Sequence, residues 1–161
     1  RFLEAATAAR DLGIDTWERQ YERVAASAPG YSWYAISHTT DRGRLARVVA
    51  LAERQLPLER IATGPGRETG FGPGWGPHGE LDFVLQDLGA FPGLGWNLIQ
   101  AGLRSPVTRN RNMALKVLAG WGRPQWPAQG EAALQEARRQ EPDPEVRARI
   151  DRVLNGQGIT N

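Results

Sequence analysis

The stretch NRNMALKVL (residues 110–118) aligns without gaps with the stretch VRARIDRVL (residues 146–154). The offset between Arg111 and its counterpart Arg147 is 36 residues. Ala114 pairs with Ile150 in this alignment, and Leu118 pairs with Leu154. A period of this length is typical of helical repeat proteins, in which each repeat is one supersecondary unit that stacks on its neighbours. The alignment therefore predicts two repeated helical units.

Both stretches are introduced in the same way, by a proline at the first turn of a helix. RSPV (residues 104–107) precedes the first copy and EPDPEV (residues 141–146) precedes the second. Proline is favoured at this position because its missing N–H would have no helical partner. Further helical segments at 94–103 and 128–139 come before these turns. We therefore predict two antiparallel helix pairs, joined by the linker GWGRPQWP (residues 120–127).

This arrangement resembles the HEAT family of α-solenoids, whose second helix typically reads V-R-x-x-A-x-x-A-L-x-x-L after an Asp or Pro turn. The second copy matches this pattern at Val146, Arg147, Ile150, Val153 and Leu154, with Asp143 and Pro144 as the turn. The first copy matches at Arg111, Ala114, Val117, Leu118 and Trp121, and departs from the pattern at Asn110 and Ser105. The resemblance covers residues 92–154 and implies an architecture rather than an activity, because one fold serves many functions.

A helical wheel of the first copy, at about 100° per residue, separates its two faces. The apolar face carries Val107, Ala114, Leu118 and Trp121, and the opposite face carries Arg109, Asn112 and Lys116. Arg111 lies at the edge of the apolar arc. In stacked repeats such an arginine buries its stem and places its guanidinium on an acid or a helix-end carbonyl. We expect this structural role for Arg111 and Arg147.

The rest of the chain completes an all-α single domain. Its expected parts are an N-terminal helical cap (1–63), a Gly/Pro-rich loop (64–79) and helical hairpins (80–161). Within the cap, helices are predicted at 2–12, 16–26, 42–55 and 58–62, while 31–37 suits a strand or a helix equally well. The loop holds seven glycines and three prolines in sixteen residues, which disfavours regular structure. The fold class is therefore antiparallel helix pairs stacked as a short HEAT-like α-solenoid.

Composition excludes several classes of protein. The 161 residues contain no cysteine, so disulfides and thiolate metal sites are excluded. No apolar run reaches the roughly 18 residues that a membrane span needs. We expect a cytoplasmic protein without metal or cofactor. Lys116 is the sole lysine beside many arginines; this excess fits either a GC-rich coding bias or arginine selected for anion binding.

The candidate catalytic residues do not form a known motif. His38 lies in SHTTD, which also reads as a capping turn, and His78 lies in the glycine-rich loop. Neither belongs to a metal spacing or a triad, and the loop lacks the context of a phosphate-binding loop, so an enzyme is not favoured. Phe71 and Trp75 in the loop either insert into a partner or fold back on the core, and folding back is preferred because exposed aromatics are costly. The remaining tryptophans are expected in the core or between repeats: Trp17, Trp33, Trp96, Trp121 and Trp126.

Charge is distributed unevenly along the chain. Residues 91–130 hold five basic side chains and no acid, whereas residues 64–90 sum to −3. The favoured function is a protein-interaction scaffold. The alternatives are a nucleic-acid-binding protein that uses the basic helix face, and a small-ligand binder or enzyme that uses the glycine-rich loop. The residues predicted to bind are Arg109, Asn112 and Lys116 on the helix and Trp75 and His78 in the loop.

Overall fold

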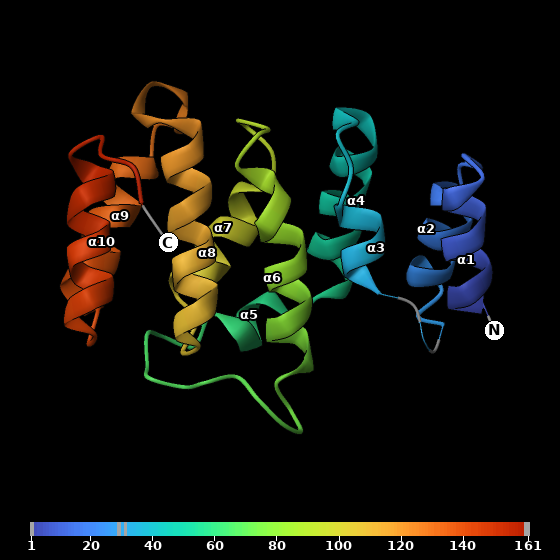
Figure 1. The fold of residues 1–161 in the computed structure, drawn as a ribbon. Coiled ribbons are helices and arrows are strands. Elements are labelled where there is room, and N and C mark those ends of the chain that lie inside the picture. Colours follow the sequence, from blue (N-terminus) through green and yellow to red (C-terminus); the bar gives the residue numbers. More distant parts are fainter. Residues whose placement is uncertain (1, 29, 31, 160–161) are drawn as a thin grey trace.

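The computed structural model describes residues 2–28, 30 and 32–159 of the chain. The described residues form ten α-helices and a short 3-10 helix, with no β-strand, so the predicted all-α class is confirmed (Figure 1). The helices are α1 (Phe2–Asp11), α2 (Trp17–Ala25), α3 (Trp33–Ser37), α4 (Arg42–Gln55), α5 (Leu58–Ile61), α6 (Gly76–Leu88), α7 (Trp96–Leu103), α8 (Thr108–Trp121), α9 (Gly130–Gln140) and α10 (Pro144–Leu154), with η1 at Arg123–Gln125.

The helices stand side by side in a row that runs from α1 and α2 at one end to α9 and α10 at the other (Figure 1). In the C-terminal half, α6, α8 and α10 form one layer, and α7 and α9 lie behind it. Helix α8 packs against α6, α7 and α10. It is therefore the central helix of this half, and its buried side chains point in more than one direction.

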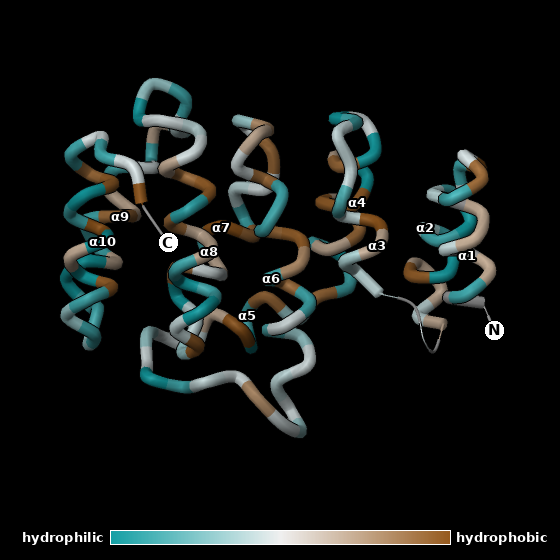
Figure 2. The backbone as a smooth tube through the Cα atoms, viewed as in Figure 1, coloured by the Kyte–Doolittle hydropathy of each residue, from teal (hydrophilic) through white to brown (hydrophobic). Residues whose placement is uncertain are grey.

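The core is one cluster of buried residues that extends from α2 to α10. Hydrophobic segments are concentrated on the central helices (Figure 2). The predicted apolar face of α8 is buried at Val107, Ala114, Leu118 and Trp121, as the wheel indicated. Trp17 and Trp33 are buried as expected, whereas Trp96 and Trp126 are partly buried and pack against the core.

Arg111 is the most unusual core residue, because a charged side chain only 1 % exposed lies among apolar ones. Its Nε and Nη2 donate to the two carboxylate oxygens of Glu141, at 2.7 and 2.9 Å. Its remaining hydrogen bonds go to the carbonyls of Gly66, Ser105 and Pro106. Arg147 donates to the carbonyl of Glu141, at the end of α9. Arg111 therefore has the expected structural role, whereas Arg147 is exposed and makes only the expected bond to a helix-end carbonyl.

The ambiguous segment 31–37 is helical at α3 rather than a strand. The hydroxyl of Ser32 caps this helix by accepting from the N–H of Tyr34 at 3.1 Å. Trp33 and Ile36 are both buried, whereas Tyr34 is exposed. Helical spacing places positions three apart on one face, and a strand would have sent these two side chains to opposite faces.

Several expected boundaries differ from the structure: the helices expected at 94–103 and 128–139 are Trp96–Leu103 and Gly130–Gln140. Residues 76–79 form the first turn of α6 and not a loop, because Pro77 sits where proline favours a helix start and the carbonyl of Trp75 accepts from His78 and Gly79. The connection between α5 and α6 therefore spans 62–75. Likewise, Gly120 and Trp121 belong to α8, so the linker between the two helix pairs begins at Gly122.

The close approach of α6 and α8 explains why residue 120 is a glycine. A Cβ atom added to Gly120 would lie 2.9 Å from the backbone oxygen of Gly89, at the end of α6. A Cβ atom at Gly79 would meet nothing closer than 4.0 Å, the distance to Nη2 of Arg109. Both glycines are helical, so they differ only in the space around them.

We predict opposite effects when these two glycines are replaced by alanine. Gly79→Ala should stabilise the protein by about 0.5–1 kcal/mol, because alanine is the better helix former. Gly120→Ala should destabilise it by about 1–3 kcal/mol, because the backbone of Gly89 must move. Urea unfolding of the two variants beside the natural chain measures both. Equal stabilisation by the two substitutions would show that α6 and α8 do not approach at this point.

Candidate functional site

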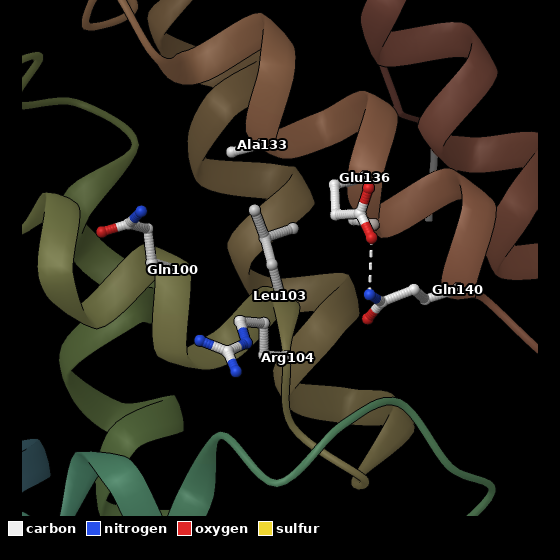
Figure 3. Close-up of a pocket in the computed structure, with 7 residues that line it drawn as sticks. Gln100, Leu103, Arg104, Ala133, Glu136 and Gln140 are labelled. Atoms are coloured by element: carbon white, nitrogen blue, oxygen red, sulfur yellow. Dashed lines mark hydrogen bonds between the residues drawn. The ribbon is translucent and has the colours of Figure 1, made fainter.

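A groove runs across α5, α7 and α9 on the side of the molecule away from α8. It consists of two depressions of about 280 and 340 Å³. Both are lined by Gln100 of α7 and by Arg104, the residue that caps α7, so they adjoin at these two side chains. Figure 3 shows the first depression, which is lined by Gln100, Leu103 and Arg104 on one side and by Ala133, Glu136 and Gln140 of α9 on the other. We call the two together the α5–α7–α9 groove.

The groove is lined by a mixture of apolar and polar side chains. Small side chains contribute much of the lining: Ala62, Ala101, Ala133 and Ala137. At the edges, Gln140 donates to Glu136 at 2.6 Å (Figure 3), and Asn97 donates to Glu53 at 3.1 Å. Within the described part of the chain, the side chains of Gln100 and Arg104 have no hydrogen-bond or ion-pair partner. The two shared residues are therefore available to a ligand.

The predicted binding face of α8 is largely engaged within the protein. Arg109 is half-exposed and pairs with Asp82 of α6. The side-chain oxygen of Asn112 accepts from Arg149 of α10 at 3.0 Å. Lys116 is exposed, and its ammonium group has no ion-pair or hydrogen-bond partner among the described residues. Of the three residues, only the lysine offers a free charge.

A buried polar network lies between α6 and α8. The hydroxyl of Ser105 donates to Oδ1 of Asn110 at 2.7 Å. The amide group of Asn110 donates to Asp82 at 2.6 Å and to the carbonyl of His78 at 2.8 Å. Burial raises the pKa of the Asp82 carboxyl, although the hydrogen bonds from Asn110 and Arg109 act in the opposite direction. Asn110, which departs from the repeat pattern, thus holds α6 against α8.

Trp75 and His78 are brought together, as neighbouring parts of the first turn of α6. Their ring centroids lie 4.8 Å apart in an edge-to-face arrangement. His78 is only 8 % exposed, although the sequence places it in a glycine-rich segment. Both of its ring nitrogens are buried without a hydrogen-bond partner. Burial lowers the pKa of the imidazole, although Asp82 acts to raise it.

Phe71 contradicts the expectation that both loop aromatics fold back. Its side chain is 74 % exposed, whereas Trp75 is partly buried. Residues 64–68 are held by backbone bonds from Gly64 to the carbonyl of Arg104 and from Glu68 to that of Pro106. The exposed phenylalanine therefore projects from a connection whose first part is fixed.

The five predicted residues do not form one site. The depression beside Trp75 and His78 includes neither Arg109, Asn112 nor Lys116.

The sequence did not predict Gln100 as a binding residue, and it indicated Arg104 only as part of the basic segment. A signal was present, because Arg104, the residue that caps α7, follows Gln100 by four positions, and helical spacing places positions four apart on one face. The sequence does not indicate which residues of α5 and α9 line the groove together with Gln100 and Arg104.

The described residues contain no group of three or more His, Asp or Glu side chains that could hold a metal ion. None of the helices among them is long and apolar enough to span a membrane. Comparison of the chain with models of known families, with curated proteins and with solved structures finds no match.

We predict that His78 makes the stability of the protein depend on pH. Since folding lowers the imidazole pKa below its ordinary value of 6.5, the unfolded chain binds the proton more readily. The contribution of the neutral His78 ring to the free energy of unfolding should be fully present above about pH 6.5. It should be lost as the pH decreases through the lowered pKa of the folded state. His78→Gln should reduce this loss in urea unfolding measured from pH 7.5 to 5. An unchanged pH profile in the variant would contradict the assignment.

Proposed function

We propose that this protein is a HEAT-like helical repeat scaffold that binds an extended, acidic segment of a partner protein in the α5–α7–α9 groove. The observation that carries the proposal is that two depressions adjoin at Gln100 and Arg104, whose side chains are not used within the fold. Stacked helix pairs build such continuous surfaces, because each pair adds its own strip to a common face.

The repeat interpretation is supported by the matched positions of the two helix pairs. The pair α7–α8 and the pair α9–α10 follow one another, and α8 packs against α10. Arg111 and Arg147 occupy equivalent positions, and each donates to backbone carbonyls in the turn before its own helix. In each helix pair, an arginine at the same position thus holds the turn that precedes its own helix.

The dimensions of the groove favour an extended peptide. Packed helices lie about 8–10 Å apart, so a groove across three of them spans about 20 Å. An extended chain rises about 3.3 Å per residue, so about six residues fit this length. The alanines leave room for alternate side chains to point toward the floor.

The free side chains at the junction fit the chemistry of a peptide with an acidic residue. The amide of Gln100 has both donor and acceptor groups, so it can bond to the N–H and the C=O of an extended backbone. The guanidinium of Arg104 matches a carboxylate through two parallel N–H donors. An acidic side chain placed near the middle of the peptide would therefore meet Arg104.

The basic face of α8 supports nucleic-acid binding less well. Arg109 already neutralises Asp82, and Asn112 is bonded to Arg149. Non-specific affinity for nucleic acid depends on several cations on one surface, each of which adds to the salt dependence. Lys116 alone does not supply them.

The test begins with random displayed peptides selected on the full chain. We expect the selected peptides to share one acidic residue at a fixed position within an extended core. Binding of one such peptide, followed by fluorescence anisotropy, should weaken at least tenfold in Arg104→Glu, because a charge pair becomes a repulsion. Gln100→Ala should weaken it less.

The matched control is Lys116→Glu, which makes the same charge change at an exposed cation on α8. This variant should bind the peptide like the natural chain. Equal losses in the two variants, or selected peptides without an enriched acid, would contradict the proposed groove. Binding of duplex DNA that falls steeply with salt and disappears in Lys116→Glu would favour the nucleic-acid alternative instead.

A further inference from the structure

A third depression, of about 360 Å³ and separate from the two that form the α5–α7–α9 groove, lies beside the first turn of α6. The end of α5 contributes Arg60 to its lining, and Thr63 follows shortly after. Trp75 and His78 come from the start of α6, and Pro73 and Pro106 complete the apolar part of the wall. No residue of the α5–α7–α9 groove takes part, so this depression is independent of the proposed function.

The buried imidazole of His78 is the feature that points to a ligand. Leaving a buried donor or acceptor without a partner costs about 1–3 kcal/mol, and His78 has two such nitrogens. Because burial lowers its pKa, the ring is neutral near pH 7 and carries one N–H donor and one acceptor. In native proteins nearly all buried polar groups bond to protein or to ordered water, so these two nitrogens call for a partner.

The indole of Trp75 covers this imidazole edge-on. The residues before it can change conformation easily, because Gly72 and Gly74 have φ angles of 92° and 89°, which favour glycine. A ligand that reaches His78 must therefore stack on the Trp75 ring or displace it. Either event alters the surroundings of both rings.

The charges around the depression favour an anion. Arg60 and Thr63 are exposed, and within the described ranges neither side chain has a partner. The depression also lies at the N-terminus of the 13-residue helix α6, which has no side-chain cap and no acid in its first turn. Such a terminus carries a partial positive charge. None of the described residues that line the depression is acidic.

We propose that this depression binds a small carboxylate that carries a flat apolar group. The single guanidinium of Arg60 suits one negative charge, and Thr63 adds a hydroxyl donor to the same carboxylate. The apolar group packs against Trp75, Pro73 and Pro106, and the imidazole N–H of His78 provides a further donor. A doubly charged phosphate lacks a second cation here.

The experiment titrates the full chain with benzoate, with uncharged benzamide and with inorganic phosphate, and follows the rings by NMR. The indole signal of Trp75 is assigned with Trp75→Phe, and the imidazole signals of His78 with His78→Gln. We expect benzoate to shift the signals of both rings and to bind at least tenfold more tightly than benzamide. Arg60→Ala should weaken benzoate binding about tenfold or more.

The control is Arg54→Ala, which removes an exposed arginine of α4 that does not line the depression. It should leave benzoate binding unchanged. The proposal is overturned if millimolar benzoate moves neither ring signal, if benzamide binds equally well, or if Arg54→Ala has the effect of Arg60→Ala. Binding of phosphate in preference to benzoate would also overturn it. Loss of peptide binding in Arg104→Glu has no bearing on these outcomes, so the two sites can fail separately.

Discussion

The guanidinium of Arg111 has five N–H donors, and the structure supplies five acceptors for them. A buried charge is tolerated only when its hydrogen bonds are complete, because its removal from water costs several kcal/mol. The acceptors come from three separate segments: the α5–α6 connection at Gly66, the α7–α8 turn at Ser105 and Pro106, and the end of α9 at Glu141. The position of one side chain therefore fixes these three segments relative to one another.

The candidate groove depends on this cross-link through its immediate neighbour in the chain. Arg104 precedes Ser105, whose carbonyl is bound by Arg111, and the carbonyl of Arg104 itself accepts from Gly64. The backbone around Arg104 is thus held from two sides while its side chain stays free. The contrast between the two arginines is instructive, because the buried one has every donor satisfied and the exposed one has none. The first maintains the fold, and the second is available to a partner.

The sequence predicted best the features that depend on residues close together in the chain. Helix α4 begins after the Asp41 cap and ends before Pro57, and its bounds were predicted from these local signals. The role of Arg111 followed from its place at the edge of an apolar arc. The start of α6 was missed because the glycines of residues 64–79 outweighed Pro77. The groove could not be predicted, since Arg104 and Gln140 come to line the same depression only after folding.

The most direct test of the cross-link is a double-mutant cycle on Arg111 and Glu141, measured by urea unfolding of the full chain. Arg111→Met and Glu141→Leu should each destabilise the protein by about 3–5 kcal/mol, because each leaves a buried charge without its partner. The double variant should lose clearly less than the sum of the two, because both charges are then removed together. Losses that simply add would contradict a buried pair that joins α8 to the end of α9.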